Sequence, residues 1–167
     1  MALKGQSAHT HRTNLFSPLN ADTGRFSLPR EFLRREGRVM DGTRIVILVA
    51  DDEELVRDMI LVMMRKDGYQ VLIASDGAEA LDLSRRYNGH INLLISDIQM
   101  PRMTGIELAD VLIKERPTMK VLLISGSTDL TIPRIFPFLR KPFTPGALRD
   151  AIVRLLPSSL AASDAEG

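Results

Sequence analysis

Five polar residues stand at or near the ends of short, mainly apolar runs. They are Asp51, Asp52, Asp97, Ser125 and Lys141. If each run is a strand of one parallel sheet, the carboxyl ends of these strands meet at a single edge, which is where open α/β folds bind their ligands. The sequence therefore predicts one rim that holds three carboxylates, a hydroxyl and an ammonium group.

Three carboxylates that converge on one rim repel each other, which favours the binding of a cation. Oxygen ligands from carboxylates, completed by water, suit Mg²⁺, with Mn²⁺ as a second choice, better than Zn²⁺. Lys141 could pair with Asp97 or with an incoming phosphoryl oxygen, and Ser125 could donate a hydrogen bond to the same oxygen. This set predicts phosphoryl transfer onto an aspartate, with Asp97 as the nucleophile.

Apolar periodicity predicts strands that alternate with helices along the chain. The strands are expected at residues 45–50, 70–75, 91–96, 120–124 and 136–139, and the helices at residues 53–66, 77–87, 105–115 and 145–156. Such alternation with short connections is typical of parallel strands joined by right-handed crossovers, with helices on both faces. We therefore predict a doubly wound α/β fold whose five-stranded parallel sheet has the flavodoxin-like order 2-1-3-4-5.

The connection between the fourth and fifth strands is too short for a normal helix. Only fifteen residues separate Ser125 from Lys141, and two of them are prolines, Pro133 and Pro137. A crossover between parallel strands needs about a dozen residues with a helix inside it. We expect the fourth helix to have one or two turns near residues 128–132, or to be missing.

One domain is expected, because 167 residues with 44% apolar content can bury one core. Residues 44–157 would form this domain. Residues 1–43 and 158–167 lack sustained apolar patterning and are predicted to be a disordered N-terminal arm and a disordered C-terminal tail. No output domain is predicted in the chain.

Charge and cysteine content argue against several classes of partner. Residues 1–40 carry seven basic and three acidic residues, and residues 41–167 carry fifteen and eighteen, so their net charges are +4 and −3. The predicted domain offers no basic surface for direct binding to nucleic acid. The sequence contains no apolar run of about 18 residues, the length needed to span a membrane. The absence of cysteine favours a reducing compartment, and we expect a cytoplasmic protein.

Four short motifs resemble those of the receiver domain of two-component response regulators. They are Val49-Ala-Asp-Asp-Glu53, Ser96-Asp-Ile-Gln-Met-Pro101 followed by Gly105, Ile124-Ser-Gly126 and Phe138-Leu-Arg-Lys-Pro-Phe143. The resemblance covers about residues 44–157. It implies that Asp97 accepts a phosphoryl group from a histidine kinase or a histidine phosphotransfer protein, in a phosphorelay that controls an unknown downstream protein.

The resemblance also assigns roles to the site residues. Asp52, Asp97 and the backbone carbonyl of Gln99 would hold Mg²⁺, and Asp51 would act through water. The Lys141–Pro142 peptide bond would be cis, which proline permits at low cost.

Four positions would control the phosphorylated state, again by resemblance. Ser125 and Phe138 match the hydroxyl and aromatic residues that switch position on phosphorylation. Gln99 and Ser127 match positions that tune the lifetime of the phosphoryl group. The shortened fourth helix departs from the family, in which this helix belongs to the output and dimer face, so a standard receiver dimer is less expected.

The first predicted helix carries six consecutive apolar residues, 59–64, and helical spacing divides its apolar side chains between two faces. The residues predicted to face the core are Leu55, Met59 and Met63. Those predicted to face outward, where they could dock a partner kinase, are Val56, Leu61 and Val62. A Leu61→Glu change would then weaken phosphotransfer without unfolding the domain.

Two other functions match part of the pattern. A haloacid-dehalogenase-like phosphohydrolase also uses Mg²⁺ and an aspartate at the end of a strand, but it needs a second aspartate where this chain has Gln99. A pseudo-receiver would act as a constitutive interaction domain. The shortened fourth helix favours it, and the complete set of acid, hydroxyl and lysine opposes it.

Overall fold

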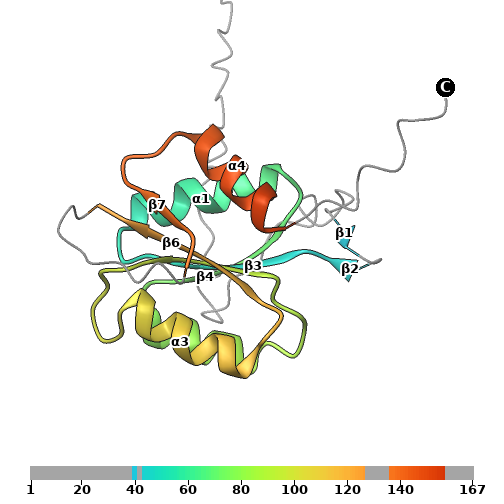
Figure 1. Ribbon diagram of the computed structural model, residues 1–167, viewed down its shortest axis with the longest axis vertical. Coiled ribbons are helices and arrows are strands. Elements are labelled where there is room, and N and C mark those ends of the chain that lie inside the picture. The colour runs from blue at the N-terminus through green and yellow to red at the C-terminus, as the bar shows by residue number, and fades with distance from the viewer. Residues whose placement is uncertain (1–38, 41–42, 127–135, 157–167) are drawn as a thin grey trace, which may run out of the picture. The chain divides into compact units, whose positions relative to one another are not determined.

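The central sheet of the computed structural model, which describes residues 39–40, 43–126 and 136–156, has five parallel strands (Figure 1). In chain order they are β3 (Val46–Ala50), β4 (Gln70–Ala74), β5 (Leu93–Asp97), β6 (Lys120–Ser125) and β7 (Phe138–Arg140). Their order across the sheet is β4-β3-β5-β6-β7. This is the predicted 2-1-3-4-5 order, and the strand bounds differ from the predicted ones by at most two residues.

Helices cover both faces of the sheet, as predicted. They are α1 (Glu54–Lys66), α2 (Gly77–Arg86), α3 (Gly105–Glu115) and α4 (Pro145–Leu155). The side chains of Asp76, Thr104 and Thr144 each accept a backbone N–H bond at the start of a helix, which satisfies donors that the helix itself leaves unpaired. These caps fix where α2, α3 and α4 begin.

The core has two halves, one on each face of the sheet, and β3 contributes to both. Ile47 and Val49 pack in the half that contains α1 and α4, whereas Val46 and Leu48 pack in the half that contains α2 and α3. Successive side chains of a strand point to opposite faces. A strand covered on both faces is therefore apolar at every position, and all five residues of β3 are buried.

Some predicted features lie outside the described residues. These are the short fourth helix near residues 128–132 and most of the predicted terminal arm and tail. A two-residue antiparallel pair, β1 (Val39–Met40) with β2 (Thr43–Arg44), precedes β3. The sequence analysis did not predict this pair, since two residues are too few to show strand periodicity. Among the helices described, none has the length and apolar content needed to cross a bilayer.

The predicted orientation of α1 was partly wrong. Leu61 is only 8% exposed and packs in the core, whereas Leu55 and Met59 are 85% and 37% exposed. Val62 is exposed and Met63 is buried, as predicted, and Val56 packs against the core in part. The helix carries apolar residues on both sides, so hydrophobic spacing alone did not define which side faces the sheet. Its outward apolar stripe is formed by Leu55, Met59 and Val62.

Candidate functional site

Two buried aspartates stand at the carboxyl ends of adjacent strands. Asp51 follows β3 and has no exposed surface, and Asp97 ends β5 and is 6% exposed. Each carboxylate accepts a bond from the backbone amide two residues later: Glu53 N to Asp51 Oδ1 is 2.9 Å, and Gln99 N to Asp97 Oδ1 is 3.2 Å. The local turn therefore orients one oxygen of each aspartate and leaves the other directed to the rim.

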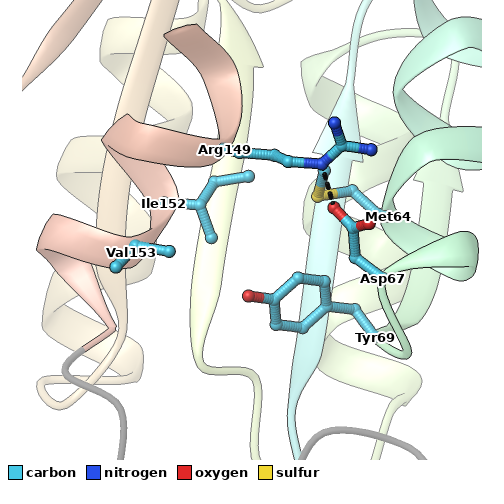
Figure 2. A pocket seen from close by; sticks show the side chains of 6 residues that line it. All are labelled: Met64, Asp67, Tyr69, Arg149, Ile152 and Val153. Atoms are coloured by element: carbon cyan, nitrogen blue, oxygen red, sulfur yellow. Dashed lines mark hydrogen bonds and ion pairs between the residues drawn. The ribbon is translucent and has the colours of Figure 1, made fainter. Parts of the chain in front are cut away.

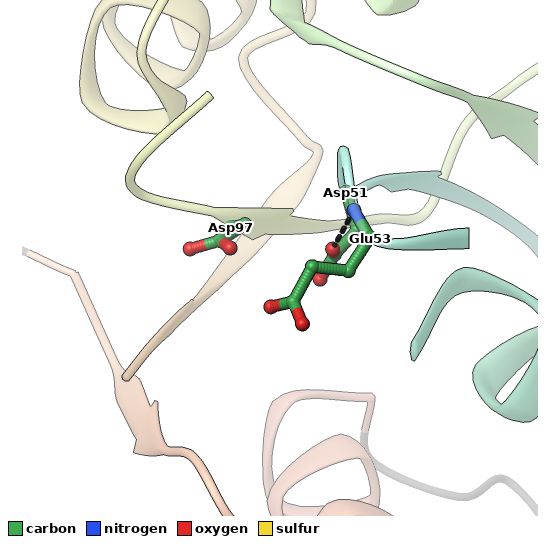
Figure 3. Close-up of side chains that lie close together, drawn as sticks. All are labelled: Asp51, Glu53 and Asp97. Carbon is green, nitrogen blue, oxygen red and sulfur yellow. Dashed lines mark hydrogen bonds between the residues drawn. The ribbon is translucent and has the colours of Figure 1, made fainter. Parts of the chain in front are cut away.

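Lys141 joins the acids of the rim. Its Nζ lies 2.8 Å from Asp97 Oδ2, 2.8 Å from Glu53 Oε1 and 3.0 Å from Asp51 Oδ2. Oxygen atoms of the same three carboxylates lie within 4.8 Å of one another, and Figure 3 shows their side chains grouped at the edge of the sheet. One ammonium group thus faces three carboxylates, so the rim keeps a formal charge of −2 when all four groups are ionised.

Ser125 lies beside this group at the end of β6. It is fully buried, and its carbonyl oxygen accepts a 2.8 Å hydrogen bond from the backbone amide of Lys141. The Lys141–Pro142 peptide bond is cis, as the resemblance implied. The backbone of β6 therefore positions the residue whose side chain crosses to Asp97.

Burial and charge act against each other in this group. Burial raises the pKa of the Asp51 carboxyl, although Lys141 and the Glu53 amide act to lower it. For Lys141, burial acts to lower the pKa, but hydrogen bonds to Asp97 and Glu53 and the negative charge of Asp51 outweigh it and raise the pKa above its ordinary value. The ammonium group is thus charged throughout the physiological pH range.

The donor set fits a hard divalent cation. Asp51 Oδ2 is buried and, despite its ion pair with Lys141, accepts no hydrogen bond of good geometry. A buried carboxylate oxygen without such a bond is costly in a metal-free site. Oxygen atoms from closely spaced carboxylates are the ligands that Mg²⁺ and Mn²⁺ prefer. The rim can therefore hold such an ion, with Asp51 and Asp97 as its buried carboxylates.

The remaining predicted site residues lie around this group. Asp52 and Gln99 are exposed, and Asp52 is not one of the three grouped carboxylates. Phe138 is 37% exposed in β7, and Ser127 lies outside the described residues. Sequence analysis missed Glu53, which takes the place expected for Asp52 near Lys141. The signal in the sequence is the third consecutive acid of the Asp-Asp-Glu run, a residue that helical patterning predicts to belong to the first helix.

The loop that follows Asp97 is closely packed. Arg102 has a φ of 68°, which is unfavourable for a residue with a side chain, and its guanidinium pairs with the buried Asp76 carboxylate at the start of α2. Gly105 lies against the Asp97 carbonyl, where a Cβ atom would overlap it. These contacts hold the backbone that carries Gln99 beside the rim.

A separate pocket lies between α1 and α4, away from the rim (Figure 2). Its lining is mostly apolar, with one ion pair between Arg149 Nε and Asp67 Oδ2 at 2.6 Å. The lining residues are Met64, Asp67, Tyr69, Arg149, Ile152 and Val153. The pocket contains no part of the acidic group, so the chemistry of the rim does not involve it.

The comparison with known families agrees with the fold and the rim. Residues 47–153 match the model of the response regulator receiver domain. The chain belongs to this family, whose members serve as signalling modules of two-component systems. The sheet order, the strand-end aspartates and the cis Lys141–Pro142 bond agree with this assignment.

Individual relatives support the same assignment. The chain is 35% identical over 112 residues to the response regulator receiver protein CpdR of Brucella abortus, covering 64% of this chain and 89% of CpdR. It is 32% identical over 123 residues to the sensor kinase CckA of the same organism, covering 70% of this chain and 13% of CckA. The crystal structure of a receiver domain protein from Clostridium thermocellum superposes with a TM-score of 0.61 at 32% identity, covering 66% of this chain and 93% of that one. The chain spans about half or less of the length of several curated relatives that it matches.

Proposed function

We propose that Asp97 accepts a phosphoryl group from a histidine kinase or a histidine phosphotransfer protein, and that the phosphorylated domain controls a downstream protein. The observation that carries this proposal is the contact of Lys141 Nζ with Asp97 Oδ2 at 2.8 Å, beside the buried Asp51 carboxylate. A buried aspartate held by an ammonium group is prepared for a reaction that adds negative charge to it. The cytoplasmic location predicted from the sequence belongs to the same proposal.

In the proposed reaction, a carboxylate oxygen of Asp97 attacks phosphorus in line with the bond that breaks. With a phosphohistidine donor, the P–N bond breaks and its electron pair stays on the imidazole. Lys141 stabilises the charge on the phosphoryl oxygens, and Ser125 donates a hydrogen bond to one of them. Mg²⁺, when bound, would neutralise further charge, with Asp97, Asp52 and the Gln99 carbonyl as the predicted ligands and Asp51 acting through water.

The chemistry proposed for this chain is limited to its own aspartate. A phosphohydrolase that turns over many substrates would need a second acid where the chain has Gln99, and the side chain of Gln99 is exposed. Gln99 and Ser127 are proposed to tune the lifetime of the phosphorylated state, and Ser125 and Phe138 are proposed to switch position with it.

The outward apolar stripe of α1 is the proposed contact for the phosphoryl donor protein. Leu55, Met59 and Val62 follow at spacings of four and three residues, so they line one side of the helix. Exposed apolar side chains in a row are suited to packing against a helix of a partner. Leu61, which the sequence analysis included, is buried and does not belong to this contact.

Intact mass spectrometry after incubation with Mg²⁺ and acetyl phosphate tests the proposal. We expect one added phosphoryl group on the wild-type chain, none on Asp97→Asn and none when Mg²⁺ is removed with a chelator. Asp58→Asn is a matched control, because Asp58 is an exposed acid of α1. Unmodified wild-type protein would favour a pseudo-receiver, and rapid hydrolysis of several phosphoesters would favour a phosphohydrolase. Either result would contradict the proposal.

A further inference from the structure

Glu53 stands at the N-cap position of α1, but its side chain does not cap the helix. The acidic or polar side chain at this position usually accepts a bond from a free N–H group of the first turn. Here the carboxylate reaches across the rim to Lys141 instead, 88 positions later in the chain, at 2.8 Å. The backbone amide of Glu53 is held by Asp51 Oδ1 at 2.9 Å. Both the backbone amide and the side chain of Glu53 are therefore bonded to residues of the rim.

The three carboxylates that contact Lys141 differ in their exposure to solvent. The side chains of Asp51 and Asp97 are 0% and 8% exposed, whereas that of Glu53 is 61% exposed. The exposed fraction of the Lys141 side chain is 13%, between the values of the buried aspartates and that of Glu53. Lys141 thus has two partners on the interior side and one on the solvent side.

A divalent cation at the rim would compete with Lys141 for the same oxygen atoms. Asp51 Oδ2 and Asp97 Oδ2 both contact Nζ, and both belong to the set proposed to hold the cation, Asp97 directly and Asp51 through water. Two cationic groups cannot share these oxygens at close range without strong repulsion. For the cation to enter, the ammonium group must move outward, and the carboxylate that lies outward is Glu53.

We propose that Glu53 is a positioning residue that retains Lys141 on the solvent side of the rim and so opens the buried carboxylates to a divalent cation. The proposal rests on the cation requirement of the proposed function and adds to it a role for a residue outside the predicted ligand set. Glu53 acts here through Lys141 and is not itself a ligand of the cation.

A double-mutant cycle on Mg²⁺ affinity tests this role. The variants are Glu53→Gln, Lys141→Met and the combination, and the readout is the Mg²⁺ titration of the backbone amide resonances of Ile98 and Gln99 by NMR. No phosphoryl donor is present, so failure of the phosphorylation proposal does not affect the result. We expect Glu53→Gln to weaken Mg²⁺ binding several-fold when Lys141 is present and much less when Met replaces it, because no ammonium group then competes.

Other outcomes of the cycle would overturn the proposal. An equal loss of affinity with and without Lys141 would mean that Glu53 acts on the cation directly, as a ligand or as a charge. No loss in either background would mean that the contact has no role in cation entry. Glu54→Gln is the matched control, because Glu54 is the next residue, is exposed and undergoes the same loss of charge.

A second measurement needs no change at Lys141, which matters if the Lys141 variants do not fold. In protein labelled with ¹⁵N-lysine and saturated with Mg²⁺, the ammonium protons of Lys141 should remain protected from exchange with water while Glu53 is present. They should exchange faster in Glu53→Gln. Equal exchange rates in the two Mg²⁺-bound proteins would overturn the proposal.

Discussion

The two helical layers of the domain differ in what they expose. Among the described residues, the large apolar side chains that are exposed all lie on α1, α4 and β7, and none lies on α2 or α3. They are Leu55, Met59, Val62, Phe138 and Val153. The pocket of Figure 2 also opens between α1 and α4. Phe138 lies on the edge strand β7, and the four exposed apolar residues that lie on helices are all on α1 or α4.

Polar contacts join the two helices of the other layer. Arg116, which follows α3, donates to Ser84 Oγ at 2.9 Å and to the carbonyl oxygens of Ser84, Tyr87 and Gly89 at 2.6, 2.7 and 2.9 Å. These carbonyls belong to the end of α2 and the loop after it, where a helix leaves its acceptors unpaired. Arg85 and Glu115 form a further pair on the surface at 2.6 Å.

This difference separates stability from contact with partners. In the α2–α3 layer, Arg116 pairs with carbonyl groups at the end of α2, and no large apolar side chain of the described residues is exposed, so substitutions there should act mainly on folding. The α1–α4 layer presents apolar side chains that the domain does not bury, so substitutions there should act mainly on binding. Substitutions in the two layers test this contrast.

The largest effect is expected from a charge placed on the buried side of α1, compared with the same charge on its exposed side. Leu61→Glu would place a charge without a partner in the core and should reduce the free energy of unfolding by more than about 3 kcal/mol. Val62→Glu changes the neighbouring residue, which is 59% exposed, and should leave stability nearly unchanged. Urea unfolding followed by circular dichroism measures both.

The same pair distinguishes folding from docking. Val62→Glu should slow phosphotransfer from a phosphorylated histidine phosphotransfer protein, because it puts a charge in the outward apolar stripe. Labelling by acetyl phosphate needs no protein donor and should proceed as in the wild type. If transfer from the protein donor were also unchanged, the stripe would have no part in docking.

A smaller effect is expected from Arg116→Ala in the α2–α3 layer. The change removes four hydrogen bonds from a charged donor, and the free energy of unfolding should fall by about 2–4 kcal/mol. Labelling of Asp97 by acetyl phosphate should not change. Arg85→Ala serves as the control, because its pair is on the surface and should contribute nothing measurable. Equal losses in the two variants would show that α2 and α3 are not joined chiefly through Arg116.

Asp51→Asn should give a smaller change in stability than Arg116→Ala, and in the opposite direction. Burial raises the pKa of Asp51, so the ionised form is destabilised in the folded state at neutral pH, and removing that charge should stabilise the protein. The advantage should decrease as pH falls through the folded pKa of Asp51, because the wild-type carboxyl then becomes neutral too. Thermal unfolding between pH 7 and pH 4 tests this, and a variant less stable than wild type at pH 7 would contradict it.

The residues of the rim could be predicted from the sequence because the ends of buried strands can be recognised in it. Apolar runs and the residues that follow them located Asp97 and Lys141 at one edge, and the alternation of elements implied the sheet that brings them together. Glu53 was missed because its position depends on a side-chain orientation at the start of α1, where the expected role was that of a helix residue. The spacing of three adjacent acids does not say which of them turns inward.

The orientation of α1 and the links within the α2–α3 layer were beyond the same reasoning. Leu61 and Leu55 are equally apolar, and only packing against β3 and β4 determines that Leu61 is the buried one. The bonds of Arg116 join residues 27 to 32 positions apart through one long side chain, which no local periodicity records. Tertiary contacts of this kind arise from the assembled fold.

The anchored loop after Asp97 also has a mechanical consequence for the rim. Arg102 is tied to Asp76, and Gly105 touches the Asp97 backbone with no space to spare, so the wall on the side of α2 is stiff. A bulky group added to Asp97 must find room elsewhere, and we expect the neighbouring β6 and β7 to yield. The contacts of the unmodified domain would thus already determine that it deforms at β6 and β7 and not on the side of α2.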